Sequence, residues 1–121
     1  TSPFRTAVDI DATTRLLIES GADSAVSLVL VKNNNPPIKA KKLEGKRVLP
    51  YACDEPEGVP RQALPPAYRR NCAVYAVRRE TLLAGSLYGG YTAGYVMPEE
   101  RSLDIDEPAD WVVAEYMLEK K

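Results

Sequence analysis

The feature that most constrains the fold is an apolar run, SAVSLVLV, at positions 24–31. A nearly continuous run rich in β-branched residues is expected for a strand that is covered on both faces. In the segment before it, Thr6 can cap a helix with Asp9 three residues later, and Gly21 ends the helical apolar pattern. A helix followed by a buried strand is half of a βαβ unit, so the sequence predicts an α/β fold.

The alternation of helix and strand resumes towards the C-terminus. Residues 72–77 (CAVYAV) predict a strand, residues 78–87 (RRETLLAGSL) a short helix, and residues 91–97 (YTAGYVM) a second strand. Residues 107–121 have Pro108 near the first turn, apolar residues three to four apart, and lysines at the end, where they oppose the helix dipole. This last segment predicts a closing amphipathic helix.

Residues 32–71 have a different character. They hold seven of the ten prolines and nine of the sixteen Lys and Arg residues, against four acids. Within them, only residues 39–51 (KAKKLEGKRVLPY) resemble a hairpin, turning at Glu44-Gly45. About 40 residues with so little core of their own are uncommon inside a compact domain, so we expect an arm that packs on a second subunit. The basic excess favours an anionic partner.

The composition excludes several kinds of chemistry. With no histidine, the chain cannot form a Ser-His-Asp or Cys-His nucleophile or a zinc site that needs imidazole. Cys53 and Cys72 lack metal-type spacing and are expected to be free thiols in a cytoplasmic protein, since no signal peptide or transmembrane run is present. The 121 residues fit at most one domain, and the opening TSPFR reads as part of a longer one.

Two carboxylates stand out near the C-terminus. If residues 102–106 (SLDID) are extended, Asp104 and Asp106 project to the same side. Such a pair is costly unless a cation lies between the carboxylates, and Mg²⁺ is typically held by one or two carboxylates plus substrate phosphates. The alternative is a solvated acidic segment before the final helix, where the helix dipole favours acids.

A second group of polar residues lies in the basic loop. Arg61, Arg69 and Arg70 bracket a proline-stiffened stretch, and arginine forks bind carboxylate and phosphate oxygens in pairs of hydrogen bonds. A rigid basic surface loop is the alternative. Tyrosines beyond this loop either form a pocket wall with hydroxyl groups or belong to the core: Tyr75, Tyr88, Tyr91 and Tyr95.

Four segments of the chain resemble, in the same order, segments of the acylneuraminate cytidylyltransferases, also called CMP-sialic acid synthetases. These segments are TSPFRTAVDID, NPPIKAKKLEGKRVLPY, RQALPPAYRRNCAVY and YVMPEERSLDIDEPADW. The resemblance spans nearly the whole chain. It implies a doubly wound nucleotidyltransferase-type α/β sheet, of which residues 1–121 form the C-terminal part, with residues 32–71 as an arm exchanged within a homodimer. It also implies a soluble enzyme, acting on neither nucleic acid nor membrane, that transfers CMP from CTP to an acylneuraminate or related nonulosonic acid and releases pyrophosphate.

The resemblance also implies roles for individual residues. Asp104 and Asp106 match the catalytic pair that binds Mg²⁺. Asn71 is expected to fix the geometry of the sugar or of a loop, and Tyr75 to lie near the sugar. Cys72 stands where the family commonly has Gly, which adopts a positive φ more readily. The full set with expected substrate-binding roles is Lys39, Arg61, Gln62, Arg69, Asn71, Tyr75 and Tyr88.

The family's N-terminal Gly-rich loop, which holds the CTP phosphates, is not among these segments. We therefore expect the chain to be inactive alone, and the strand at 24–31 to have an open edge. Two other hypotheses stay open. One is a noncatalytic dimerisation or sugar-acid-binding module, and the other is a fragment of a DxD glycosyltransferase, which would also bind Mg²⁺ and nucleotide but gives no reason for the loop at 61–71.

Overall fold

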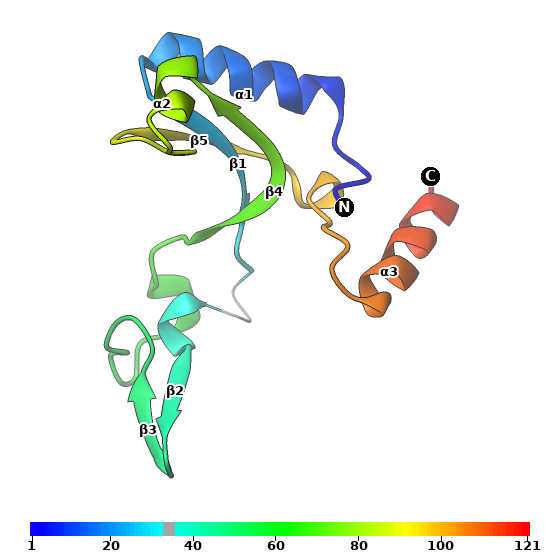
Figure 1. Ribbon diagram of the computed structural model, residues 1–121. Helices are drawn as coiled ribbons and strands as arrows, with labels where there is room; N and C mark the ends of the chain where they lie inside the picture. Colours follow the sequence, from blue (N-terminus) through cyan, green and yellow to red (C-terminus); the bar gives the residue numbers. More distant parts are fainter. Residues whose placement is uncertain (33–35) are drawn as a thin grey trace. The chain divides into compact units, whose positions relative to one another are not determined.

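The computed structural model describes residues 1–32 and 36–121, which form two compact units (Figure 1). The larger unit, residues 1–29 and 69–121, contains the sheet and the α-helices. The smaller unit is residues 30–68. The elements in chain order are α1 (Ala7–Ser20), β1 (Ser24–Leu30), η1 (Pro37–Lys39), β2 (Lys41–Glu44), β3 (Arg47–Pro50), η2 (Arg61–Ala63), β4 (Tyr68–Val77), α2 (Arg79–Leu83), β5 (Thr92–Val96), η3 (Glu99–Arg101) and α3 (Pro108–Glu119).

β1 is the central strand of a three-stranded sheet with the order β4-β1-β5. β1 and β5 are parallel, with Ser24 opposite Thr92 at one end and Leu28 opposite Val96 at the other. The predicted buried strand is confirmed, since most of β1 is inaccessible to solvent. The open edge expected for this strand is wrong, because β4 and β5 cover both of its edges.

β4 runs antiparallel to β1. The backbone N–H of Arg78 donates to the carbonyl of Asp23 at 3.1 Å, and the N–H of Val74 donates to Ser27 Oγ at 2.8 Å, so the two strands advance in opposite directions. The sheet is therefore mixed. The α/β class is confirmed, while the doubly wound topology stays a prediction.

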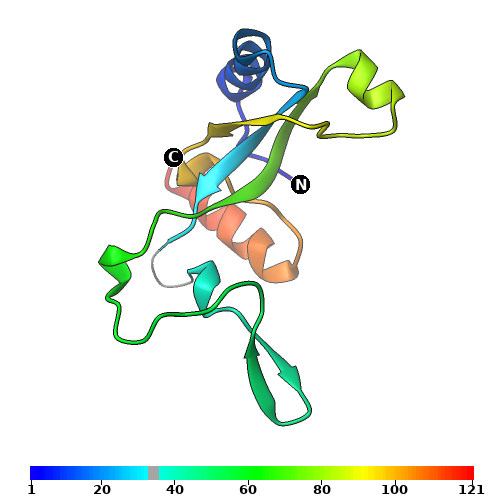
Figure 2. The ribbon, with the colours of Figure 1, turned by 90° about the vertical axis from the view of Figure 1, so that its left-hand side faces the viewer.

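α1 lies along the sheet, as the views in Figures 1 and 2 both show. The predicted capping box is present: the Thr6 and Asp9 side chains each bond the other residue's backbone at the N-terminus of α1. Gly21 ends the helix with a φ of 69°, a conformation in which a side chain would be strained. Leu17 then packs on the sheet, in an apolar cluster with Ala22, Ala25 and Ala93.

The carboxylate of Asp9 is buried, with no exposed surface, and is surrounded by donors. Arg101 binds it with two hydrogen bonds, from Nε at 2.9 Å and from Nη2 at 2.7 Å. The hydroxyl of Tyr95 donates to it at 3.3 Å, and the backbone N–H and hydroxyl of Thr6 donate at 3.0 Å each. The hydrogen bond from Arg101 is the main reason why the pKa of Asp9 lies well below its usual range.

α3 begins at Pro108 as predicted, with a capping box between Glu107 and Asp110. Its packing differs from the amphipathic prediction, because Ala114 is its buried residue and the apolar side chains around it are largely exposed. These exposed residues are Trp111, Val112, Val113, Tyr116 and Leu118. No helix among the described residues has the length and apolar character that a membrane span requires.

The smaller unit contains the predicted hairpin. β2 and β3 pair antiparallel, with Glu44 opposite Arg47, so the turn is formed by Gly45 and Lys46. Gly45 has a φ of 62°, which the tight turn requires. Every residue of β2 is exposed, as expected for a strand pair with little core of its own. The role of this unit as a dimerisation arm stays a prediction.

Because the pKa of Asp9 is lower in the folded chain than in the unfolded chain, its contribution to stability is complete above about pH 4 and is lost as the pH falls further. Asp9→Asn should lower the free energy of unfolding at pH 7 by roughly 2 kcal/mol, because it removes the charge that pairs with Arg101. The loss is smaller than for a fully buried ion pair, because Arg101 retains some access to solvent. The substitution should also flatten the pH dependence, measured by urea unfolding between pH 7 and 3. Asp11→Asn, at an exposed position of α1, is the control and should leave the profile unchanged. An unaltered acid profile in Asp9→Asn would contradict the assignment.

Candidate active site

The loop that carries Asp104 and Asp106 forms neither helix nor strand, and contacts from several directions hold it in place. Before it, Arg101 binds Asp9 as described. In its middle, the backbone N–H of Ile105 donates to the carbonyl of Thr1 at 2.7 Å. After it, the backbone N–H of Asp106 donates to the carboxylate of Asp110 at 3.0 Å. The loop is therefore held to the first residue of the chain and to the first turn of α3.

The two carboxylates have unequal surroundings. Asp104 is half-buried, and its Oδ1 atom is fully buried with no hydrogen-bond partner among the described residues. The side chain of Asp106 is exposed and lies just before α3. A buried carboxylate oxygen without a donor costs stability, so Asp104 Oδ1 needs an explanation other than packing. Binding of a hard cation through oxygen is one that fits the atom.

Asn71 links the sheet to this loop from inside the fold. Its Oδ1 accepts a hydrogen bond from Ser27 Oγ at 2.6 Å, and its Nδ2 donates to Ser102 Oγ at 3.0 Å. The residue is 1% exposed. Both amide atoms of Asn71 are thus bonded within the protein, and the role of this residue in the site stays a prediction.

Arg69 lies beside the same loop. It lines a cavity of about 370 Å³ together with Leu103 of the loop and Val113 and Met117 of α3. Glu99 and Glu100 also line this cavity, so its wall is mixed in charge. The structure therefore places Arg69 beside Leu103, the residue before Asp104.

Tyr75 and Tyr88 come from different elements and meet at Arg70. Arg70 Nη1 donates to the hydroxyl of Tyr75 at 3.5 Å and also to the hydroxyl of Tyr88. Its guanidinium carbon lies 5.6 Å from the centre of the Tyr88 ring. The hydroxyl of Tyr75 also donates to Cys72 Sγ at 3.6 Å, and this contact, together with burial, raises the pKa of Tyr75.

The loop that carries Tyr88 is held tightly against the start of β1. The carboxylate of Asp23 accepts hydrogen bonds from the N–H groups of Gly90 and Tyr91, at 3.0 and 2.9 Å. Ser24 Oγ donates to the carbonyl of Tyr88 at 2.7 Å. A Cβ atom at Gly89 would lie 2.4 Å from Asp23 Cβ, so this close approach requires glycine. Hydrogen bonds to the backbone of Tyr88 and of the residues that follow it thus fix the position of Tyr88.

Cys72 adopts a φ of 59°, the positive value that favours glycine. It is the single described residue other than glycine with this conformation. The position therefore has the backbone geometry that Gly would favour, and Cys72 occupies it under strain. Both Cys72 and Cys53 are free, as predicted, and both are exposed.

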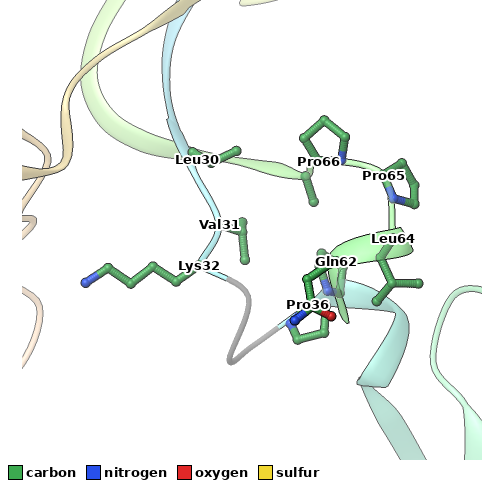
Figure 3. Close-up of a pocket in the computed structure, with 10 residues that line it drawn as sticks. Leu30, Val31, Lys32, Pro36, Gln62, Leu64, Pro65 and Pro66 are labelled. Carbon is green, nitrogen blue, oxygen red and sulfur yellow. The ribbon is translucent and has the colours of Figure 1, made fainter. Parts of the chain in front are cut away.

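Lys39, Arg61 and Gln62 belong to the smaller unit. Lys39 ends η1 with an exposed side chain, and Arg61 begins η2, with its side chain outside the described part of the structure. Gln62 lines a cavity of about 170 Å³ whose wall is rich in proline, shown in Figure 3. Its other lining residues are Leu30, Val31, Lys32, Pro36, Pro37, Leu64, Pro65, Pro66 and Ala67.

The described residues contain no group of three or more Asp, Glu or Cys side chains that could hold a metal ion. Asp104 and Asp106 are thus not part of a larger cluster of such side chains among the described residues. Two carboxylates suit Mg²⁺, which keeps several waters and completes its coordination with substrate oxygens.

The sequence is similar to two curated proteins. It is 23% identical, over 121 residues and 99% of its length, to the "Post-translational flagellin modification protein B" of Campylobacter coli, of which it covers 50%. Over 62 residues, half of the chain, it is 34% identical to the "CMP-N,N'-diacetyllegionaminic acid synthase" of Campylobacter jejuni, of which it covers 26%. The chain thus spans half the length of the first relative, and the match to the second covers about a quarter of that protein. No family model matches the chain.

The sequence did not point to every residue that builds this region. The capping box predicted Asp9 as a helix-end residue, but its ion pair with Arg101 joins positions 92 apart and has no local signal. Asp23 also carried no signal. Arg70 was a candidate only as one of several loop arginines, and its contact with Tyr88 joins positions 18 apart.

Replacing Cys72 with glycine should stabilise the chain by about 1 kcal/mol. The free energy gained by removing the strain at positive φ exceeds the cost of the greater conformational entropy that glycine gives to the unfolded chain. Cys72→Ala is the matched control, since it removes the thiol but keeps the strain. Urea unfolding should therefore show a higher midpoint for Cys72→Gly than for Cys72→Ala. Equal midpoints for these two variants would contradict strain at this position.

Proposed function

We propose that this chain is part of a cytidylyltransferase that transfers CMP from CTP to an acylneuraminate or a related nonulosonic acid such as a legionaminic acid, releasing pyrophosphate. The similarity to a protein named as a CMP-N,N'-diacetyllegionaminic acid synthase supports this class of reaction. The observation that carries the proposal is the buried, unpartnered Oδ1 of Asp104 in a loop fixed against α1 and α3.

Asp104 and Asp106 are the residues that would hold Mg²⁺ in this proposal. The ion would supply neutralisation of the charge on the triphosphate oxygens during nucleotidyl transfer. Asp104 suits this role because it is held in place and has one oxygen without a protein donor. Asp106 suits it because its backbone is fixed by Asp110 while its carboxylate stays accessible.

The remaining residues would bind and orient the substrates. Arg69, beside the Asp104 loop, is suited to contact an anionic group, and Tyr75 and Tyr88 to contact the sugar. Asn71 would act indirectly, by holding Ser102 and so the loop. In the smaller unit, Lys39, Arg61 and Gln62 would provide further contacts to anionic substrates.

We further propose that residues 1–121 form the C-terminal part of a doubly wound nucleotidyltransferase domain and that residues 32–71 are the dimerisation arm of a homodimer. The share of the relatives that the chain covers supports a longer functional unit. The largely exposed hairpin of the smaller unit supports an arm with an external partner.

Formation of a CMP-sugar tests the proposal. CTP, Mg²⁺ and either N-acetylneuraminate or N,N'-diacetyllegionaminate are incubated with the chain alone and with the chain extended by the segment encoded upstream of it. We expect product from the extended protein. Asp104→Asn and Asp106→Asn should each lower the rate by roughly two orders of magnitude, a typical loss for one electrostatic contact to a transition state.

Glu119→Gln is the control for these two variants, since Glu119 is an exposed carboxylate in the same part of the chain. Its rate should stay close to that of the unmodified protein. Absence of product from both folded proteins would overturn the proposal. Binding of the sugar acid without any turnover would favour the noncatalytic binding module instead.

A further inference from the structure

Arg70 is held in a fixed orientation at the surface of the larger unit. Its Nη1 donates to the hydroxyls of Tyr75 and Tyr88, and its guanidinium lies over the Tyr88 ring. Tyr75 is on the same strand, whereas Tyr88 comes from the loop anchored by Asp23 and Ser24. Contacts from two elements restrict the side chain more than either contact alone would.

No acidic side chain among the described residues forms an ion pair with Arg70. A guanidinium has five N–H donors, and the hydrogen bonds that Arg70 makes to described residues use Nη1. The donors on Nε and Nη2 are therefore available to a ligand. An exposed arginine that is oriented by hydroxyls and has no carboxylate partner in the fold is suited to take one from outside.

The two hydroxyls extend this donor character. Each hydroxyl accepts a hydrogen bond from Arg70, so its own proton is free to be donated. Tyr75 donates its proton to Cys72 Sγ. For Tyr88, no acceptor is found among the described residues. Arg70 and the hydroxyl of Tyr88 thus present unused hydrogen-bond donors next to each other, which suits an oxyanion.

We propose that Arg70, with the hydroxyl of Tyr88, binds the carboxylate of the sugar acid and so selects acids over neutral sugars. The class of ligand rests on the proposed function, while the site itself rests on the contacts of Arg70. The planar fork of the guanidinium matches the two oxygens of a carboxylate. Tyr75, besides the contact to the sugar proposed above, helps to orient Arg70.

Calorimetry without nucleotide or metal tests this inference. N-acetylneuraminate, N,N'-diacetyllegionaminate and the methyl ester of each are titrated into the whole chain. The chain should bind at least one of the acids about tenfold or more tightly than its ester. Arg70→Gln should weaken binding of the acid by about tenfold or more and leave binding of the ester unchanged. Arg70→Lys should restore part of the preference, since it keeps the charge but loses the fork.

Two further variants complete the experiment. Arg79→Gln, at an exposed arginine at the start of α2, is the matched control and should keep the full preference for the acid. Tyr88→Phe keeps the ring that Arg70 lies over but removes the hydroxyl, so it should reduce the preference without unfolding the chain.

The inference is overturned if the chain binds acid and ester equally, if it binds neither, or if Arg70→Gln weakens both to the same extent. These outcomes are separate from those of the proposed function. A preference for the acid that depends on Arg70, in a protein that never forms a CMP-sugar, would retain the inference and reject the cytidylyltransferase. If turnover depends on Asp104 but replacing Arg70 does not affect binding of the acid, the cytidylyltransferase is retained and the inference about Arg70 is rejected.

Discussion

The ion pair between Asp9 and Arg101 determines where the candidate active loop lies. Asp9 is buried in the first turn of α1, and Arg101 ends η3, directly before the loop with Asp104. A buried carboxylate without this partner would be strongly unfavourable, so the fold and the pairing depend on each other. The same carboxylate caps α1 through Thr6 and accepts a hydrogen bond from Tyr95 of β5. One side chain thus ties a helix, a strand and the loop together.

A second polar network supports the loop from the sheet. Ser27 of β1, Asn71 of β4 and Ser102 of the loop form a buried chain of hydrogen bonds in which both amide atoms of Asn71 are used. Satisfied buried networks hold their members in one arrangement, because each alternative leaves a polar group unpaired. The loop is therefore supported by the rigid part of the fold, which is what a site with defined geometry requires.

Local features of the fold could be predicted from the sequence, because their signals are local. The capping box at Thr6, the stop at Gly21 and the start of α3 at Pro108 all follow from neighbouring residues. The direction of β4 and its place beside β1 could not be predicted, since they depend on pairings between distant segments. The amphipathic pattern of α3 did not predict its exposed apolar side chains either, because periodicity shows which residues share a face but not what covers that face.

The candidate site shows the same division. Asp104 and Asp106 could be proposed from their spacing, but their unequal exposure, with a buried Oδ1 atom on Asp104, could not be predicted. The contact of Arg70 with Tyr88 likewise depends on the loop that Asp23 and Ser24 hold in place. The structure therefore adds the surroundings of each charged side chain, which determine whether that side chain has a partner within the protein.

Paramagnetic NMR with Mn²⁺ in place of Mg²⁺ tests most directly the proposal that Asp104 and Asp106 bind a divalent cation. Amide signals of residues 102–107 should broaden at the lowest Mn²⁺ concentrations, and this local effect should disappear in Asp104→Asn. In Asp9→Asn it should weaken, because the loop has lost its anchor. Broadening that is spread over the exposed carboxylates of the chain, or that is unchanged in Asp104→Asn, would contradict the account.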